Sequence, residues 1–184
     1  MKSDEKLIAE YLEGDESPLE ILVERYAGYV FNFIHKYVRD INSAQDLTQE
    51  VFIKVWKNIR KFDPDRNFKV WIFQIARNTV FDFLRKRKEI NFSQFEKEDE
   101  IYDIADSDPL PSEIFDRKNI REKVQEATQA LSEKYQEVIT LYYQNQLNFR
   151  EIAEVTGEPI DTIKSRHRRA IALLKRSLSK NEPK

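Results

Sequence analysis

The stretch LNFREIAEVTGEPIDTIKSRHRRAIALLKRSL, residues 147–178, decides the fold of the C-terminal part of this chain. Its first half places apolar residues three and four positions apart, which predicts a short amphipathic helix. Gly157 supplies the positive φ angle that ends this helix, and Pro159 follows in the turn. The helical spacing resumes at Ile160 and continues to Leu178. The stretch therefore predicts a helix, a tight turn and a second helix.

The second of these helices is strongly cationic. No acidic residue occurs between Asp161 and Glu182. A short helix, a glycine turn and a cationic second helix are typical of a DNA-reading helix-turn-helix, whose second helix enters the major groove. An ordinary helical hairpin with a solvated basic face is the alternative for this stretch taken alone. The residues predicted to contact duplex DNA are Thr162, Lys164, Ser165, Arg166, Arg168 and Arg169.

Composition narrows the class of protein further. Of the 184 residues 40% are hydrophobic and 35% are charged, and only three are glycine, which is typical of a highly charged all-α protein. The absence of cysteine and the presence of only two histidines argue against disulfides and zinc sites, so we expect no metal and no cofactor. No apolar run approaches the roughly 18 residues that a membrane span needs, and the N-terminus lacks the apolar core of a secretory signal. A cytoplasmic protein is expected.

The charge and proline pattern divides the chain into two small helical domains. Residues 1–88 are predicted to form an N-terminal helical bundle, and residues 117–184 a C-terminal domain that contains the helix-turn-helix. Residues 89–116 hold ten acidic residues against one base, Lys97, and two prolines. Such a composition cannot bury enough apolar surface to pack, so we expect a flexible acidic linker.

The helix predicted from residue 68 to residue 88 carries an unusual second face. Trp71, Ile75 and Asn78 lie about a quarter-turn from its apolar core side, and the helix ends in Arg85-Lys86-Arg87-Lys88. A planar ring beside an amide can stack on and hydrogen-bond an unpaired base, while the cationic end follows the phosphates. The alternative is that Trp71 is a partly buried core residue and that the four bases are a solvated helix end.

Several motifs carry a family resemblance that covers nearly the whole chain. DLTQEVFIKVW (46–56), FDP (62–64) and FKVWIFQIARN (68–78) resemble the promoter-melting domain of bacterial extracytoplasmic-function sigma factors. YLEGD (11–15) and LVERY (22–26) resemble the N-terminus of that family, and LSEKY (131–135), IAE (152–154) and TIKSR (162–166) its C-terminal domain. The resemblance implies a transcription initiation factor that has no catalysis of its own, binds core RNA polymerase and directs it to promoters.

The resemblance also implies a role for each motif. The helix over residues 46–56 would dock on the clamp helices of the largest polymerase subunit through Asp46, Gln49, Glu50 and Ile53. The C-terminal second helix would read the minus-thirty-five element as duplex, and an anti-sigma factor is implied as a further partner. The loop and helix after residue 61 would hold a base unstacked from the minus-ten element. The residues assigned to this single-stranded site are Phe62, Trp71, Ile75, Ala76, Asn78, Arg85, Lys86, Arg87 and Lys88.

The sequence departs from the family pattern at two positions, and two other functions are alternatives to the one that the resemblance implies. Ser132 stands where the family usually has proline, and His167 where it usually has leucine. His167 falls on the apolar side of its helix, so we expect it to pack, although turned outward it could touch DNA.

The alternative function is a stand-alone helix-turn-helix regulator; an enzyme with a metal site in the acidic linker is less favoured, because nothing there would fix the carboxylates. We hypothesise that the linker lies along a basic polymerase channel such as the RNA exit path.

Overall fold

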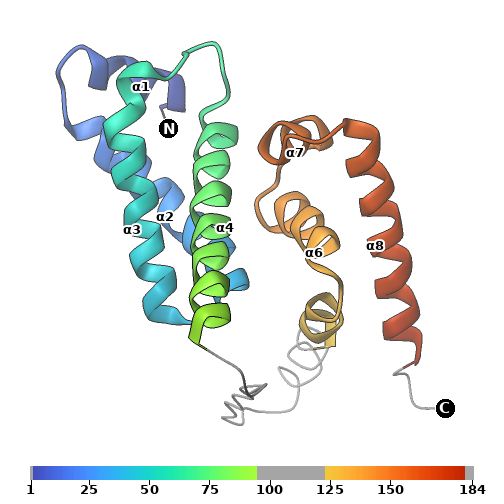
Figure 1. The fold of residues 1–184 in the computed structure, drawn as a ribbon. Coiled ribbons are helices and arrows are strands. Elements are labelled where there is room, and N and C mark those ends of the chain that lie inside the picture. The colour runs from blue at the N-terminus through green and yellow to red at the C-terminus, as the bar shows by residue number, and fades with distance from the viewer. Residues whose placement is uncertain (1, 95–122, 181–184) are drawn as a thin grey trace, which may run out of the picture.

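The structure, a computed structural model, describes residues 2–94 and 123–180, and all its regular elements within these ranges are helices. The predicted all-α fold class is confirmed. Residues 123–129 are also helical and precede α6. The elements, labelled in Figure 1 where there is room, are α1 (Asp4–Leu12), α2 (Ser17–Val38), α3 (Ile41–Asn58), the 3-10 turn η1 (Ile59–Lys61), α4 (Phe68–Gln94), α6 (Glu133–Ile139), the π-helical turn η2 (Thr140–Gln144), α7 (Phe149–Thr156) and α8 (Ile160–Lys180).

The N-terminal module packs α2, α3 and α4 around one aromatic-rich core. Phe33 of α2 meets Phe73 of α4 edge-on, with 5.6 Å between ring centroids, and both side chains are fully buried. Asp40 starts α3 because its carboxylate accepts a hydrogen bond from the Ser43 backbone N–H at 2.7 Å. α1 closes the bundle with Leu7, which has no exposed surface. This rigid core holds the outer faces of α3 and α4 in place.

Helix α4 is longer than the sequence predicted. It ends at Gln94 instead of Lys88, so the predicted start of the linker at residue 89 falls inside a helix. No glycine or proline lies between Lys88 and Gln94 to stop the helix, which explains the extension. The remainder of the predicted linker, residues 95–116, lies outside the described residues, as does the hypothesis about its path.

The C-terminal module contains the predicted helix-turn-helix. Asn148 caps α7 by accepting from the backbone N–H groups of Arg150 and Glu151, and the Glu151 carboxylate accepts from the Asn148 N–H in return. Gly157 ends α7 with a φ angle of 72°, as predicted. At its C-terminal end α6 passes into the π-helical turn η2.

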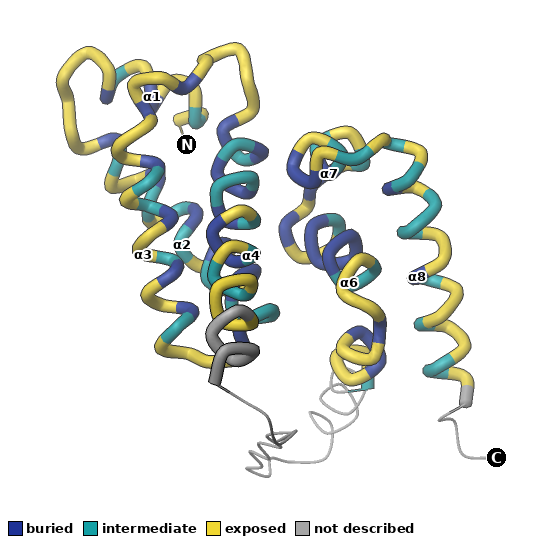
Figure 2. Tube along the Cα trace, in the orientation of Figure 1, coloured by how far each residue is buried: buried dark blue, intermediate teal, exposed yellow. Residues whose placement is uncertain are grey.

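The two modules share one hydrophobic core, which the sequence did not predict. Buried residues of the C-terminal module, among them Val138, Leu141 and Ile152, belong to the same cluster as the core of the N-terminal bundle. α7 packs directly on α4, and the two helices lie side by side in Figure 1. Figure 2 shows that α6 and α7 carry buried segments, whereas exposed and half-buried residues alternate along most of α8.

Candidate nucleic-acid interface

An open hollow of about 480 Å³ lies between α3 and α4, and we call it the α3–α4 hollow. Three of its residues come from α4 on the face predicted to meet an unpaired base: Trp71 and Ile75 are half-buried and Asn78 is exposed. Its complete lining is Lys54, Asn58, Lys61, Trp71, Ile75, Asn78 and Thr79. The structure therefore brings an aromatic ring, an aliphatic chain and an amide together with two lysines.

The wall of the α3–α4 hollow is fixed by contacts beneath it. The Trp71 ring packs against the rings of Phe62 and Phe68, with centroids 4.9 and 5.7 Å away. On the opposite side the Lys54 ammonium donates to the Thr79 hydroxyl at 2.9 Å and pairs with Glu50 at 2.7 Å. Because these neighbours restrict Trp71 and Lys54, the hollow is already formed in the absence of a ligand.

Two residues assigned to the same site lie beneath it instead. Ala76 has no exposed surface and Phe62 is only 6% exposed. Ala76 points into the bundle because it shares the core side of α4 with Ile72 and Val80, which are also fully buried. This structure therefore presents neither Ala76 nor Phe62 to a ligand, and Phe62 acts as the support of the Trp71 ring.

The cationic end of α4 is accessible along its length. Arg85, Lys86, Arg87 and Lys88 are all exposed. Arg85 pairs with Asp82 at 3.0 Å, one turn earlier on the same helix. Such an exposed pair contributes little to stability and leaves the guanidinium free to exchange partners. The four side chains form a second cationic group on the N-terminal module, besides Lys54 and Lys61 at the hollow.

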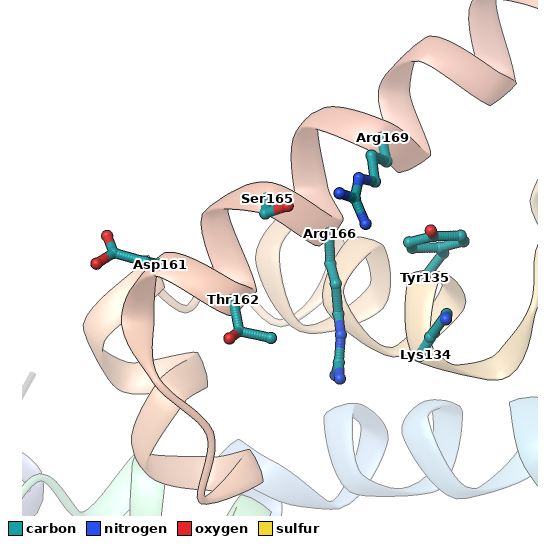
Figure 3. A pocket seen from close by; sticks show the side chains of 7 residues that line it. All are labelled: Lys134, Tyr135, Asp161, Thr162, Ser165, Arg166 and Arg169. Carbon is teal, nitrogen blue, oxygen red and sulfur yellow. The ribbon is translucent and has the colours of Figure 1, made fainter.

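A second hollow, of about 440 Å³, separates the start of α6 from α8, and we call it the α6–α8 groove. Figure 3 shows its lining: Arg169 lies near the ring of Tyr135, and Asp161 points away from both. Lys164, Arg168 and Arg169 are exposed, as duplex contacts require. The lining residues are Lys134, Tyr135, Asp161, Thr162, Ser165, Arg166 and Arg169.

Arg166 differs from the other arginines of α8. Its guanidinium is bonded to both carboxylate oxygens of Glu158, at 2.8 and 2.6 Å, and its side chain is 20% exposed. Glu158 belongs to the turn between α7 and α8. The bidentate pair therefore holds α8 against this turn. Arg166 thus helps to fix the orientation of α8 relative to α7.

His167 packs among aromatic rings, as its position on the apolar side of α8 predicted. Its ring centroid lies 4.8 Å from that of Tyr142, 5.1 Å from Phe149 and 5.7 Å from Tyr143. Burial lowers the pKa of the imidazole. The neutral ring thus serves as a packing group where an aliphatic side chain would otherwise stand.

The outer side of α3 is a separate exposed surface. Asp46, Gln49, Glu50 and Ile53 are all exposed there, with 48% of Ile53 accessible. Trp56 follows one turn after Ile53 and is 56% exposed. A tryptophan and an isoleucine side by side in water, next to carboxylates, are typical of a protein-binding surface.

Both modules match known families. The family described as Sigma-70 region 2 matches residues 22–90, and Sigma-70, region 4 matches residues 121–174. The RNA polymerase sigma factor RpoE of Cereibacter sphaeroides is 32% identical over 166 residues, which cover 90% of this chain and 88% of that protein. The chain belongs to the extracytoplasmic-function (ECF) sigma factors. SigW of Bacillus subtilis, another ECF sigma factor, is 28% identical over 178 residues, or 94% of this chain and 95% of that protein.

The predicted class of function is thereby confirmed: the chain is an RNA polymerase sigma factor, a transcription initiation factor. A stand-alone regulator is not favoured, because the region 2 match spans nearly all of α2, α3 and α4. Two solved structures share its fold. RpoE of Bartonella quintana, determined with the anti-sigma factor NepR, gives a TM-score of 0.71 at 23% identity and covers 89% of this chain and 98% of that one. CnrH, determined with the cytosolic domain of CnrY, gives 0.69 at 22% identity and covers 98% and 100%.

Sequence reasoning missed three residues that the structure places at these surfaces of the sigma factor. Lys134 and Tyr135 line the α6–α8 groove although they precede the helix-turn-helix. Trp56 lies beside the predicted polymerase-binding residues of α3. Its spacing of three from Ile53 could have placed it on the outer stripe, whereas nothing local placed Lys134 opposite α8.

The described residues of the sigma factor show neither a metal-binding cluster nor a membrane helix. Within residues 2–94 and 123–180 no three His, Asp or Glu side chains are grouped so that they could hold a metal ion. No described helix is long and apolar enough to cross a membrane.

Proposed function

We propose that this sigma factor binds core RNA polymerase, directs it to specific promoters and helps to open the minus-ten element. The observation that carries the proposal is the α3–α4 hollow. It combines a supported tryptophan ring with the exposed amide of Asn78 and a cationic rim. Duplex recognition alone has no use for a stacking platform, whereas an unpaired base gains from both stacking and a fitted amide.

The other cationic surfaces would contact the remaining parts of the promoter. Lys164, Arg168 and Arg169 on α8 would contact the minus-thirty-five element as duplex, together with Thr162 and Ser165, while Arg85–Lys88 would meet phosphates near the melted strand. Arg166 would act on the same element indirectly, by holding α8 against Glu158. The N-terminal module, α1–α4, thus serves melting, and the C-terminal module, α6–α8, serves duplex recognition.

Protein partners would bind the outer side of α3. Asp46, Gln49, Glu50 and Ile53 form the proposed contact with the polymerase, and Trp56 adds an apolar anchor beside them. An anti-sigma factor is the second proposed partner, since RpoE of Bartonella quintana, which shares the fold, was determined with such a protein. It would cover α3 or insert between the modules. The protein would act in the cytoplasm, without catalysis of its own.

Transcription from two templates tests the proposal. Purified core polymerase would be supplied with the wild type or with Asn78→Ala, on a fully duplex promoter and on the same promoter with a pre-melted minus-ten element. We expect the wild type to initiate on both. Asn78→Ala should lose at least about tenfold on the duplex and much less on the pre-melted template, because the amide offsets part of the cost of unpairing the base and the pre-melted template does not incur that cost.

Asn32→Ala is the matched control, since Asn32 is an exposed helical asparagine on α2. It should initiate like the wild type on both templates. Equal losses on the two templates for Asn78→Ala would contradict a role in melting. A protein that shifts duplex DNA yet never confers initiation on core polymerase would overturn the whole proposal.

A further inference from the structure

The outer face of α8 has two flanks, and each carries its own set of polar side chains. At 3.6 residues per turn, Thr162, Ser165 and Arg169 lie along one flank, which forms one wall of the α6–α8 groove. Lys164 and Arg168 lie about a third of a turn away, on the other flank. The helix therefore offers cations in two directions at once.

The first of these flanks faces a second wall, which the start of α6 provides. Lys134 and Tyr135 stand on this wall, although both precede the helix-turn-helix. The Lys134 ammonium lies 5.3 Å from the centre of the Tyr135 ring, which is a cation–π contact. In Figure 3 the ring lies between the side chains of Lys134 and Arg169. Each wall of the groove thus contributes one cation.

The wall on α6 is held in place by a small apolar cluster that it shares with α8. Leu131, Ile139 and Ala170 are buried together, and the Tyr135 side chain packs against them. The Gln136 amide also donates to the Leu131 carbonyl at 2.6 Å, which fixes the turn before α6. Because both walls rest on this packing, the groove is already formed in the absence of a ligand.

The positive charge of the two walls is available to a ligand. Asp161 lines the groove, but its carboxylate lies 3.9 Å from the Lys164 ammonium, which belongs to the other flank. Within residues 2–94 and 123–180, no carboxylate comes within ion-pair distance of Lys134 or Arg169. Two cations on facing walls, with no acid between them, suit an anion that passes through the groove.

The dimensions of duplex DNA indicate which anion this is. An α-helix with its side chains is about 10–12 Å wide and the major groove of B-DNA is about 12 Å wide, so a helix in that groove has one phosphate backbone on each side. The proposed function puts α8 in this position. One backbone would then follow the flank that carries Lys164 and Arg168. The other would run between α8 and the start of α6.

We propose that the α6–α8 groove seats the sugar-phosphate backbone of one strand of the minus-thirty-five duplex. Lys134 and Arg169 bind phosphates of this strand from opposite walls. Lys164 and Arg168 bind the opposite strand. This inference rests on the proposed function and extends the duplex contact beyond the helix-turn-helix, to a wall that belongs to α6.

The salt dependence of binding tests Lys134 first. The polymerase holoenzyme would be titrated with a labelled duplex that carries the minus-thirty-five element of a promoter that the wild type transcribes. Lys134→Ala should weaken binding about three- to tenfold and lower the slope of log affinity against log salt by about one, because one phosphate contact is lost. Lys134→Arg should restore both values. Lys134 is exposed, so these variants keep the fold, and Lys6→Ala on α1 is the matched control that should change neither value.

Neutral phosphates test whether the strand lies between the two walls. A methylphosphonate would replace one phosphate at a time, first in one strand and then in the other. Lys134→Ala and Arg169→Ala should each become insensitive to the same or adjacent phosphates of one strand, whereas Arg168→Ala should become insensitive to a phosphate of the opposite strand. If Lys134→Ala lowers the salt slope but stays sensitive to every replacement, the lysine acts only through its long-range charge, and the seat is disproved.

The outcomes separate this inference from the function beneath it. If the wild type initiates transcription and Arg168→Ala weakens duplex binding, but Lys134→Ala binds like the wild type, the seat on α6 fails alone. The same holds if the replacements assign Lys134 and Arg168 to one strand. If the wild type never initiates with core polymerase, the proposed function fails.

Discussion

The α3–α4 hollow and the α6–α8 groove are built in opposite ways. In the hollow, Trp71 and Ile75 rest on a fully buried core and two lysines stand at the rim. Three cations, Lys134, Arg166 and Arg169, line the groove, and Arg166 among them is already bound to Glu158. Stacking on a base requires a ring in one position, so the hollow depends on rigid packing beneath it. Attraction of phosphates acts over several ångströms, so the groove depends on charge.

This difference predicts what damages each site. Changes in the core below α4 should abolish single-strand binding through loss of shape, whereas added salt should act mainly on the groove. The predictions below test the contrast, beginning with the largest effect.

Removal of a buried ring on the core side of α4 should have the largest consequence. Phe73 is fully buried against Phe33, so Phe73→Ala should lower the free energy of unfolding of the N-terminal module by about 3–5 kcal/mol. Urea denaturation measures the loss. Phe149→Ala is the matched change in the C-terminal module, where the ring is half-buried, and its loss should be clearly smaller. Equal losses would mean that the two sites do not differ in the rigidity of their support.

The stacking ring itself should affect one kind of DNA only. Trp71→Ala should weaken binding of a minus-ten single strand by about 1–3 kcal/mol, the usual value of one stacked base, and leave duplex binding unchanged. Fluorescence anisotropy with the polymerase holoenzyme and labelled oligonucleotides measures both. Tyr29→Ala is the control because Tyr29 is an exposed aromatic residue on α2 that does not line the hollow. A parallel loss on duplex DNA would show that the hollow does not distinguish strands.

Local sequence signals were sufficient to predict much of the difference between the hollow and the groove. Gly157 and the apolar spacing on either side of it predicted the helix-turn-helix, and the quarter-turn between core side and second face predicted that Trp71, Ile75 and Asn78 would lie together. Each of these signals acts within a few turns of one helix. Ala76 shows that neighbouring positions of a helix must be assigned one by one: Ile75 lines the hollow, whereas Ala76, the next residue, points into the core.

Contacts between distant residues left no such signal. Arg77 and Glu137 are 60 residues apart, and Lys36 and Thr140 are 104 apart. A charged residue that will be buried by another module has the same local pattern as one that stays in water. The acidic residues after Lys88 also hid the continuation of α4, because composition predicts where a chain cannot pack but not where a helix stops. These contacts between the two modules could therefore be found only in three dimensions.

An arginine of the groove should be recognised by its salt dependence. Arg169→Ala should weaken binding of a minus-thirty-five duplex moderately and lower the slope of log affinity against log salt by about one, because one phosphate contact releases about one counterion. Single-strand binding should stay unchanged. Lys6→Ala removes one exposed charge from α1 as a control and should leave the slope unaltered. An unchanged slope for Arg169→Ala would place its guanidinium away from the phosphates.

The smallest predicted effect concerns His167 and distinguishes its two orientations. Burial lowers the pKa of the imidazole, so below about pH 6.5 the unfolded chain binds a proton more readily than the folded one. Stability from this residue is therefore complete at neutral pH and is lost as pH falls through the lowered pKa. His167→Leu keeps an apolar group among Tyr142, Tyr143 and Phe149 but cannot titrate, so only the wild type should show this component between pH 7.5 and 5.5 in urea denaturation. Identical pH profiles would mean that the ring is hydrated and turned away from these three aromatic rings, toward the side of α8 that is proposed to meet the duplex.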